Sequence, residues 1–324
     1  MTRHTRPTIT FAVSLLATLG LAVGAAPAVA GGPRPTTYQL TGDVNNATGS
    51  KFEGIGADER RGLFYVSEVT GGEIHRGSAH SDETVEWLDG DGTDGRFTAR
   101  GITVDEQGRV DIAGGPNGIG TGRPDLWVYE ADGTLLAALR APGVGVFLND
   151  VALGPDGAAY FTNSNDAQVF RVADDGAGWQ ASLWADATDR VERLAGFNLG
   201  GIVLSADRSA FVVAQGNAGL LWRFDASTGD VSEVATGGAD LVNADGLVLR
   251  GNQLTVVRNF SRMIATLRLS ADGSRAVLLD QEATAADRVL TTAKALRGRI
   301  LYVDSKFDEP VATGPYEILT DPTR

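Results

Sequence analysis

Cysteine is absent from this sequence of 324 residues, and histidine occurs only three times. The absence of cysteine excludes disulfides and thiol chemistry, and it favours a fold large enough to be stable without cross-links. Zinc is not expected, because its usual protein ligands are imidazole and thiolate groups. A Ser-His-Asp triad is not indicated either, since His75 and His80 lie in or near a predicted outer hairpin and no Gly-x-Ser-x-Gly motif occurs.

Long amphipathic helical patterns are also scarce. The best candidate, residues 284–290, is about two turns long at most. Short β-runs dominate, and the Gly, Asp and Asn clusters between them are turn residues that tolerate positive φ. We therefore expect an all-β fold. The candidate strands are residues 63–66, 126–129, 159–162, 210–213, 220–224, 254–257 and 300–303.

One long apolar run is present, at the N-terminus. Arg3 and Arg6 precede the apolar residues 9–23, and the small residues that follow end in Ala28-Val29-Ala30. This order is typical of a signal peptide, and the run is too short and too rich in Ala and Gly for a membrane span of about 20 apolar residues. We expect residues 1–30 to be cleaved and the protein to be secreted. The alternative is an uncleaved anchor.

Acidic residues outnumber basic ones. Removal of residues 1–30 would leave 26 basic and 41 acidic residues, a net charge of −15. Such a surface keeps a secreted protein in solution and argues against nucleic acid or anionic membranes as partners. We expect a monomer that acts on a small molecule.

A unit of one polar, one small and one aliphatic residue, followed by a β-run, recurs along residues 36–320. The copies are 47, 49, 51, 45 and 47 residues apart. This is the length of a four-stranded propeller blade, whereas a pair of β-sandwiches has no reason to repeat at this spacing. We therefore predict a single six-bladed β-propeller over residues 36–320. The copies begin at Glu53, Arg100, Asn149, Gly200, Asp245 and Thr292.

A propeller must close its ring. We expect the N-terminal strand Thr37–Leu40 to join the last blade beside Tyr316–Leu319. This pairing between the two ends of the chain would leave no open sheet edge.

The first residues of the six repeats are expected to converge on the channel axis, because the innermost strand of every blade begins at one end of the channel. Two carboxylates and one or two carboxamides without Cys or His form a hard-oxygen site, which suits Ca²⁺ with its 6–8 oxygen ligands. We expect Arg100 to pair with an acid in the channel, and Arg100 and Asn149 to contact substrate. The predicted metal ligands are Glu53, Asn149, Asn198 and Asp245.

Each of these side chains also has a simpler interpretation. Glu53 and Asp245 are alternatively solvated loop acids, and Asn149 and Asn198 are alternatively turn residues that bond their own backbone. What favours a site is that acid and amide side chains occur at the same position of several repeats.

Two other motifs do not support a ligand site. Residues 89–95 resemble a calcium loop, but Arg100 occupies the twelfth position, where an EF-hand has Glu. We expect these residues to form a solvated hairpin loop. The glycine-rich residues 114–120 lack the strand and helix context of a nucleotide-binding loop.

Several of these segments resemble one protein family. Glu53-Gly54-Ile55, with residues 62–67 and 72–76, resembles the first blade of the senescence marker protein, gluconolactonase and luciferin-regenerating-enzyme family. Residues 147–151 and 154–157 resemble its third blade, and Asp245-Gly246-Leu247 resembles a later blade that supplies an acidic ligand. The resemblance covers residues 50–307 and is carried by the set rather than by any one motif.

The resemblance implies a six-bladed propeller with a divalent cation, usually calcium, on the channel axis, and lactone hydrolysis in some members. The family's first-blade Glu matches Glu53, its third-blade Asn matches Asn149, and its later Asp matches Asp245. The fourth blade departs from the pattern, because Gly200 stands where the family usually has Asn. Asn198, two residues upstream, is then the expected fourth-blade ligand, and without it the cation has one ligand fewer.

These observations together predict a secreted, divalent-cation-dependent hydrolase of the lactonase type. The cation, most simply Ca²⁺, would polarise the carbonyl of a lactone or ester while Asp245 or Glu53 accepts a proton from the attacking water. The alternative is a non-catalytic extracellular binding propeller with a structural calcium ion, which Gly200 favours. A quinone-dependent sugar dehydrogenase is less well supported, because the basic and histidine residues of such pockets are scarce here.

Overall fold

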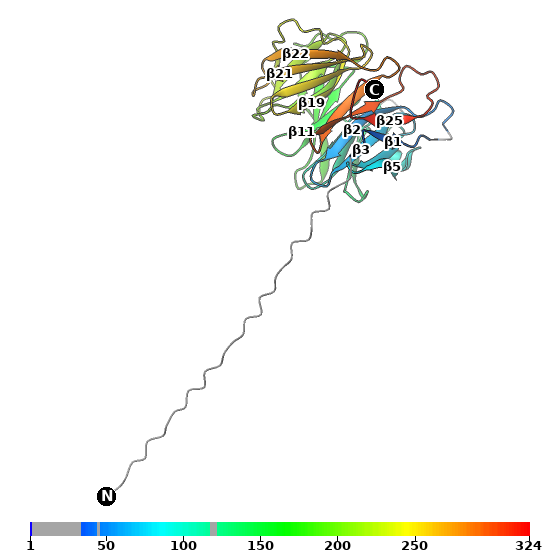
Figure 1. Ribbon diagram of the computed structural model, residues 1–324. Coiled ribbons are helices and arrows are strands. Elements are labelled where there is room, and N and C mark those ends of the chain that lie inside the picture. Colours follow the sequence, from blue (N-terminus) through cyan, green and yellow to red (C-terminus); the bar gives the residue numbers. More distant parts are fainter. Residues whose placement is uncertain (2–33, 44–45, 117–121) are drawn as a thin grey trace. The chain divides into compact units, whose positions relative to one another are not determined.

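The computed structural model describes residues 1, 34–43, 46–116 and 122–324 (Figure 1). The predicted signal peptide, apart from Met1, and residues 117–120 of the glycine-rich stretch lie outside this part. The chain divides into the units Met1–Gly32 and Pro33–Arg324, and every element below belongs to the second unit. No helix in the described ranges is long and apolar enough to cross a membrane.

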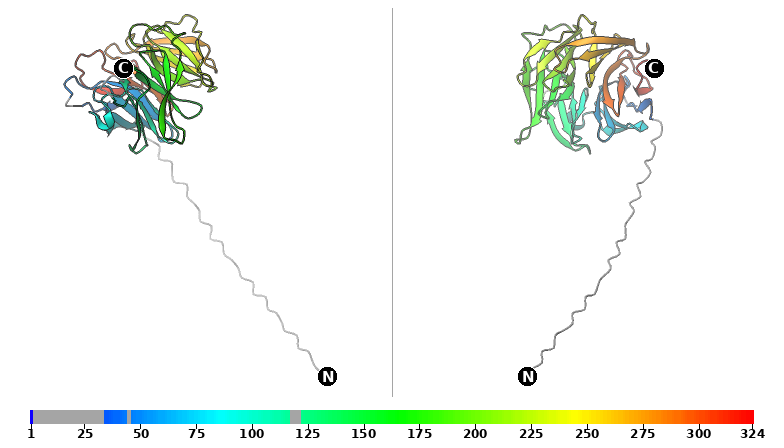
Figure 2. Two further views of the ribbon diagram at one scale, coloured as in Figure 1. Left: turned by 180° about the vertical axis from the view of Figure 1, so that it is seen from behind. Right: turned by 60° about the vertical axis from the view of Figure 1, so that its left-hand side comes forward.

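Strands and loops make up this unit, as predicted (Figure 2). Its helical content, over the described residues, is the 3₁₀ turn η1 (Thr93–Gly95). The helix considered for residues 284–290 is absent, and residues 286 and 287 form a turn instead. Thr284 and Ala285 donate their backbone N–H groups to the carbonyl oxygens of Arg262 and Pro322, which ties this segment to its neighbours.

The strands form six blades; in the first five the chain runs from the inner to the outer strand, whereas the outermost strand of the sixth comes from the N-terminal part of the chain. Blades 1 and 6 share one eight-stranded sheet, and short β8 (Gly115–Pro116) adds to blade 3. Blade 1 comprises β2 (Phe52–Asp58), β3 (Leu63–Glu68), β4 (Ile74–Ser78) and β5 (Ser81–Leu88), and blade 2 comprises β6 (Ile102–Val104), β7 (Val110–Ala113), β9 (Leu126–Tyr129) and β10 (Leu135–Leu139). Blade 3 comprises β11 (Phe147–Leu153), β12 (Ala159–Asn163), β13 (Gln168–Asp174) and β14 (Trp179–Asp186), and blade 4 comprises β15 (Leu199–Leu204), β16 (Ala210–Gln215), β17 (Leu220–Asp225) and β18 (Val231–Glu233). Blade 5 comprises β19 (Ala244–Arg250), β20 (Gln253–Arg258), β21 (Met263–Leu269) and β22 (Ala276–Ala283), and blade 6 comprises β23 (Leu290–Leu296), β24 (Arg299–Asp304), β25 (Tyr316–Leu319) and β1 (Thr37–Leu40).

The inner strands form a closed ring. Each of β2, β6, β11, β15, β19 and β23 contacts the next in this order, and β23 contacts β2. Closure occurs in blade 6, where β1 pairs antiparallel with β25 and aligns Tyr38 with Ile318. Figure 1 shows these strands side by side in blue and red, from opposite ends of the chain. The predicted six-bladed propeller and its closing strand pair are confirmed.

The core lies between the blades rather than at the axis. Six clusters of buried apolar side chains are present, and each one joins two neighbouring blades. In β16, Val213 packs toward blade 3 while Val212 packs toward blade 5. Because successive side chains of a strand point to opposite faces and both faces are buried, this strand is apolar from Ala210 to Ala214.

Candidate functional site in the central channel

The repeat positions identified in the sequence lie at irregularities in the inner strands. The pairing of the inner strand with the second strand shifts register around these positions in blades 1, 3, 4, 5 and 6. A β-bulge bends its strand and re-aims the side chain, and bulges are frequent near functional sites. The residues in the shifted segments include Glu53, Asn149, Gly200 and Asp245.

The glycine that follows the repeat position in blades 1, 2, 4 and 5 is explained by packing around the axis. A Cβ atom at Gly54 would lie 2.0 Å from the carbonyl oxygen of Arg100 in the next blade. A Cβ atom at Gly201 would lie 2.1 Å from the carbonyl oxygen of Asp245. Glycine therefore allows the backbone of one inner strand to pass directly against a site residue of its neighbour.

Blade 3 has Asp150 at this position instead of glycine. The Asp150 carboxylate accepts hydrogen bonds from the backbone N–H groups of Val151 at 2.8 Å and Ile202 at 3.2 Å. Ile202 belongs to blade 4, so the buried carboxylate links two inner strands. Its negative charge also repels the carboxylates of Glu53 and Asp245 in the channel.

One cavity of about 330 Å³ collects most of the predicted site residues. This volume falls within the range of small-molecule sites. Of the seven residues singled out at or beside the repeat positions, all except Thr292 line it. The six that do so are Glu53, Arg100, Asn149, Asn198, Gly200 and Asp245.

Glu53 is buried and pairs with Arg100, as predicted for an acid in the channel. The guanidinium Nη1 lies 2.5 Å from Glu53 Oε2, and the Arg100 guanidinium also lies 4.6 Å from the centre of the Phe147 ring. Burial raises the pKa of Glu53, the positive charge of Arg100 opposes this, and the negative charge of Asp150 adds to it. Arg100 is thus the counter-ion of the first-blade carboxylate.

Asp245 has no such cationic partner among the described residues. Its Oδ2 accepts a hydrogen bond of 2.8 Å from the Asn259 side-chain amide. Burial raises the pKa of Asp245 well above its ordinary value, and repulsion by Glu53 raises it further, while the Asn259 hydrogen bond lowers it. The channel therefore holds two buried carboxylates that repel each other and one guanidinium that pairs with only one of them.

Asn149 and Gly200 complete this side of the cavity. The Asn149 carboxamide is buried and forms no hydrogen bond within the described part of the chain. A Cβ atom at Gly200 would lie 3.7 Å from Asp245 Oδ1 and 3.9 Å from Asn149 Oδ1, which is ordinary van der Waals contact. Gly200 therefore leaves room for a side chain between the two oxygens.

Asn198 lines the cavity, but its carboxamide already holds the loop that precedes β15. Its Oδ1 accepts hydrogen bonds from Leu194 N, Gln215 Nε2 and Asn217 Nδ2 at 2.9–3.3 Å. Its Nδ2 donates to the carbonyl oxygens of Ser164, Leu194 and Gly196. With its oxygen engaged by three donors, Asn198 is not retained as a cation ligand in the proposal below.

Thr292, the sixth repeat position, takes part in closing the ring. Its hydroxyl donates a hydrogen bond of 2.5 Å to the carbonyl oxygen of Glu53, and the Thr291 hydroxyl donates to the same oxygen at 3.1 Å. Blade 6 thus fixes the backbone that carries the first-blade carboxylate.

Sequence reasoning missed the residues that follow the second strand in blades 3 to 6. The second strand is antiparallel to the first, so its end meets the start of the inner strand at the same face of the ring. Reading the repeat at the ends of β12, β16, β20 and β24 would have identified them. They are Ser164, Asn217, Asn259, Phe260 and Phe307, all of which line the cavity.

The two histidines of the predicted outer hairpin lie away from the cavity. His75 is buried on β4, beside Glu68 and edge-on to Phe52. His80 lies exposed in the turn between β4 and β5. Among the residues that the structure describes, no histidine lines the channel cavity.

The donor set in the cavity fits a hard divalent cation. Glu53, Asn149 and Asp245 offer carboxylate and carboxamide oxygens, and the two carboxylates carry more negative charge than Arg100 balances. A bound divalent cation would relieve their repulsion, and calcium accepts an irregular set of protein and water oxygens. The cavity therefore suits calcium better than zinc.

No protein-family model matches this sequence, and none of the curated proteins compared with it gives a significant match. Solved structures are similar in fold. A gluconolactonase from Xanthomonas campestris has 17% identity and a TM-score of 0.57, with 90% of this chain and 98% of that chain covered. Regucalcin, a calcium-binding protein from Agrobacterium tumefaciens, has 16% identity and a TM-score of 0.56, with 85% and 92% covered. A catalytically inactive virginiamycin B lyase from Staphylococcus aureus with quinupristin has 14% identity and a TM-score of 0.59, with 89% and 88% covered. The chain thus has the six-bladed propeller fold of gluconolactonase, regucalcin and virginiamycin B lyase, at low sequence identity.

Proposed function

We propose that this protein is a divalent-cation-dependent hydrolase that opens a lactone or cleaves an ester in its central channel. The observation that carries the proposal is the convergence of two buried carboxylates and the Asn149 carboxamide on one cavity of about 330 Å³. The fold shared with a gluconolactonase and with a calcium-binding regucalcin supports it.

Glu53, Asn149 and Asp245 would hold the cation, and calcium is the ion that their oxygens suit best. When bound, the cation supplies a Lewis acid that polarises a carbonyl oxygen. Arg100, beside Glu53 at the cavity wall, would donate hydrogen bonds to the substrate, and Asn149 would orient it.

Asp245 is the better proton acceptor of the two carboxylates. The positive charge of Arg100 opposes the rise in the pKa of Glu53, whereas burial and the negative charge of Glu53 raise the pKa of Asp245. A general base works best when its pKa lies near the working pH. Because direct coordination to calcium lowers a carboxylate pKa, Asp245 would be only loosely coordinated when it takes a proton from water. The hydrogen bond from Asn259 would hold it in place.

Aromatic side chains at the cavity support a substrate with an apolar part. Phe197 and Phe260 line it and are 60% and 53% exposed. Phe197 also packs against Phe147, with 5.0 Å between the ring centres. Polar groups at the bottom of the cavity and aromatic rings along its wall are typical of a pocket for an uncharged small molecule. The acidic residues of the cavity disfavour anions.

We further propose that the protein is secreted and acts as a monomer on a diffusible substrate. The basic, apolar and small-residue order of residues 1–30 supports secretion. The net charge of −13 supports the absence of nucleic-acid and anionic-membrane partners.

The test is hydrolysis of aldonolactones, aromatic esters and acyl-homoserine lactones by the protein with calcium and with a chelator. We expect turnover with calcium, loss with chelator, and at least a hundredfold loss in Asp245→Ala, by analogy with the removal of other groups that act in the transition state. Asp230→Ala, which removes an exposed acid outside the cavity, is the matched control. Activity that survives both the chelator and Asp245→Ala would reject the mechanism.

The second candidate is a binding propeller in which calcium serves only structure. The observation that favours it is Gly200, which leaves the fourth blade without a side-chain oxygen at the repeat position. A large chelator-induced fall in melting temperature without turnover of any substrate would select this function.

A further inference from the structure

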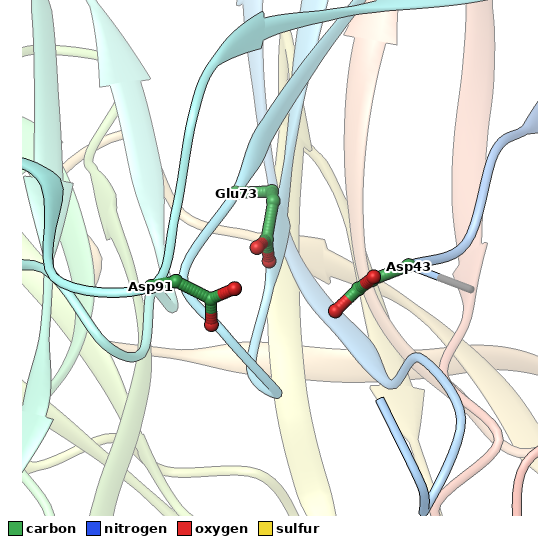
Figure 3. Close-up of side chains that lie close together, drawn as sticks. All are labelled: Asp43, Glu73 and Asp91. Carbon is green, nitrogen blue, oxygen red and sulfur yellow. The ribbon is translucent and has the colours of Figure 1, made fainter. Parts of the chain in front are cut away.

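Three carboxylates approach one another outside the central channel. Asp43, Glu73 and Asp91 each offer an oxygen, and these oxygens lie within 4.8 Å of one another. Figure 3 shows the three side chains directed toward a common space. Asp43 follows β1, Glu73 immediately precedes β4, and Asp91 lies between β5 and η1. We call these three residues the acidic triad.

Glu73 is the buried member of the acidic triad. It is only 6% exposed, and its Oε2 atom has no hydrogen-bond partner among the described residues. A buried carboxylate oxygen that lacks a partner is costly, because it has lost its water without gaining a hydrogen bond. A carboxylate directed at two others is neutralised either by a proton or by a bound cation, and a cation would compensate for its burial.

Two glycines make room for the Glu73 carboxylate. A Cβ atom at Gly71 would lie 2.4 Å from Glu73 Oε2, and one at Gly90 would lie 2.2 Å from Glu73 Oε1. A Cβ atom at either position would therefore require the Glu73 carboxylate to shift. The two loops that carry these glycines therefore enclose the carboxylate without a side chain between them.

The loop that carries Asp91 is largely exposed, as expected for residues 89–95, but it connects blades 1 and 2 and is not a hairpin loop. It is also held by hydrogen bonds. Asp91 donates its backbone N–H to the Gly71 carbonyl oxygen at 2.9 Å. Arg96, fully buried, donates to the carbonyl oxygens of Gly72 at 2.6 Å and Asp89 at 2.5 Å. The positions of Glu73 and Asp91 are thus fixed relative to each other by the backbone.

The charged groups that act most strongly on Glu73 are other carboxylates. No lysine or arginine forms an ion pair with Glu73 or Asp91 in the described part of the chain, and the nearby Arg96 directs its donors to carbonyls and to the Tyr129 hydroxyl. Burial, together with the negative charges of Glu68, Asp91 and Asp43, raises the pKa of Glu73 to about 7.

We propose that the acidic triad is a second cation site, which binds calcium independently of the central channel. Three carboxylates supply hard oxygens from three segments, and water completes the 6–8 ligands that calcium takes. The ion would connect the segment after β1 to two loops of blade 1. Since β1 also pairs with the last strand of the chain, binding would stabilise the closed ring.

The test measures how many calcium ions the full chain binds, by equilibrium dialysis and calorimetry, in wild type, Glu73→Gln, Asp245→Asn and the double variant. We expect Glu73→Gln to remove one bound ion whatever residue occupies position 245. In the Asp245→Asn background, where the acidic triad is intact, a hundredfold excess of calcium over Kd should raise the melting temperature by about 5 °C. Glu73→Gln should abolish that rise.

Two further variants keep the test decisive. Asp91→Asn changes an exposed member of the acidic triad without disturbing the core, and we expect it to weaken calcium binding at least tenfold. Asp89→Asn removes an exposed acid from the same loop and should leave binding unchanged. The proposal is overturned if Glu73→Gln binds as many calcium ions as wild type, or if Asp91→Asn and Asp89→Asn behave alike.

Discussion

Gly200→Asn places a side-chain oxygen where the fourth blade has none. The Cβ atom would lie 3.7 Å from Asp245 Oδ1 and 3.9 Å from Asn149 Oδ1, so the new carboxamide fits between two proposed ligands. The backbone at Gly200 does not have positive φ, and a side chain is therefore tolerated there. If the channel binds calcium, this substitution should add one ligand.

The expected magnitudes follow from two contributions. A hydrogen bond or ligand contact to a charged group contributes about 1.5–3 kcal/mol, which corresponds to roughly 10- to 100-fold tighter calcium binding. Replacing glycine at an unstrained position stabilises by about 0.4–1 kcal/mol through the unfolded chain. Gly200→Ala is the matched control, because it supplies the same Cβ atom without an oxygen.

The assay is calcium titration by calorimetry, together with thermal unfolding in chelator and in calcium. Both variants should gain a little stability in chelator, and only Gly200→Asn should gain calcium affinity. Equal dissociation constants for Gly200→Asn and Gly200→Ala would refute the reasoning, since the space beside Asp245 and Asn149 would then not be a ligand position.

Three other changes test the electrostatics. Arg100→Gln removes the counter-ion of Glu53 and should destabilise the protein by about 3 kcal/mol in chelator. Calcium should restore most of this lost stability. If thermal unfolding shows an equal loss of stability in chelator and in calcium, the proposed cation is contradicted. Asn259→Ala removes the hydrogen bond to Asp245 and should lower kcat/KM or calcium affinity about 10- to 100-fold, which steady-state kinetics and calorimetry measure. Asp111, 4% exposed on β7, has its pKa raised to about 7 by burial, with a further contribution from Asp105. Its folded-state pKa exceeds the unfolded value of about 3.9, so stability falls as pH rises from about 4 to 7. Asp111→Asn should therefore raise the melting temperature at pH 8, by an amount equivalent to about 2–4 kcal/mol. At pH 4 the melting temperatures of the variant and the wild type should differ much less.

The repeat allowed the fold and three of the polar residues in the channel cavity to be predicted. Its spacing required six similar sheets, and a ring of similar sheets brings equivalent positions to one axis whatever the loops do. Glu53, Asn149 and Asp245 follow from this topology alone, and the structure places them in one cavity.

What the repeat did not predict depends on local hydrogen bonding and on contacts between distant segments. Asn198 has a suitable side chain near the right position, but six contacts within its loop and neighbouring strands decide its direction. The acidic triad combines residues from three segments, so no linear spacing reveals it. Residues 89–95 were compared with a continuous calcium loop, although only Asp91 contributes to the triad.

The position of β1 also constrains how the chain reaches its native state. Among the described strands β1 is synthesised first, yet it pairs with β25, the last of them, and also meets β5 in parallel through Gln39 and Glu83. Blades 1 to 5 can assemble from contiguous sequence, whereas the sixth blade must wait until residue 319 is available. Until then the first strand has no antiparallel partner, and a chain shortened before Tyr316 would expose β24 as an edge open to intermolecular pairing.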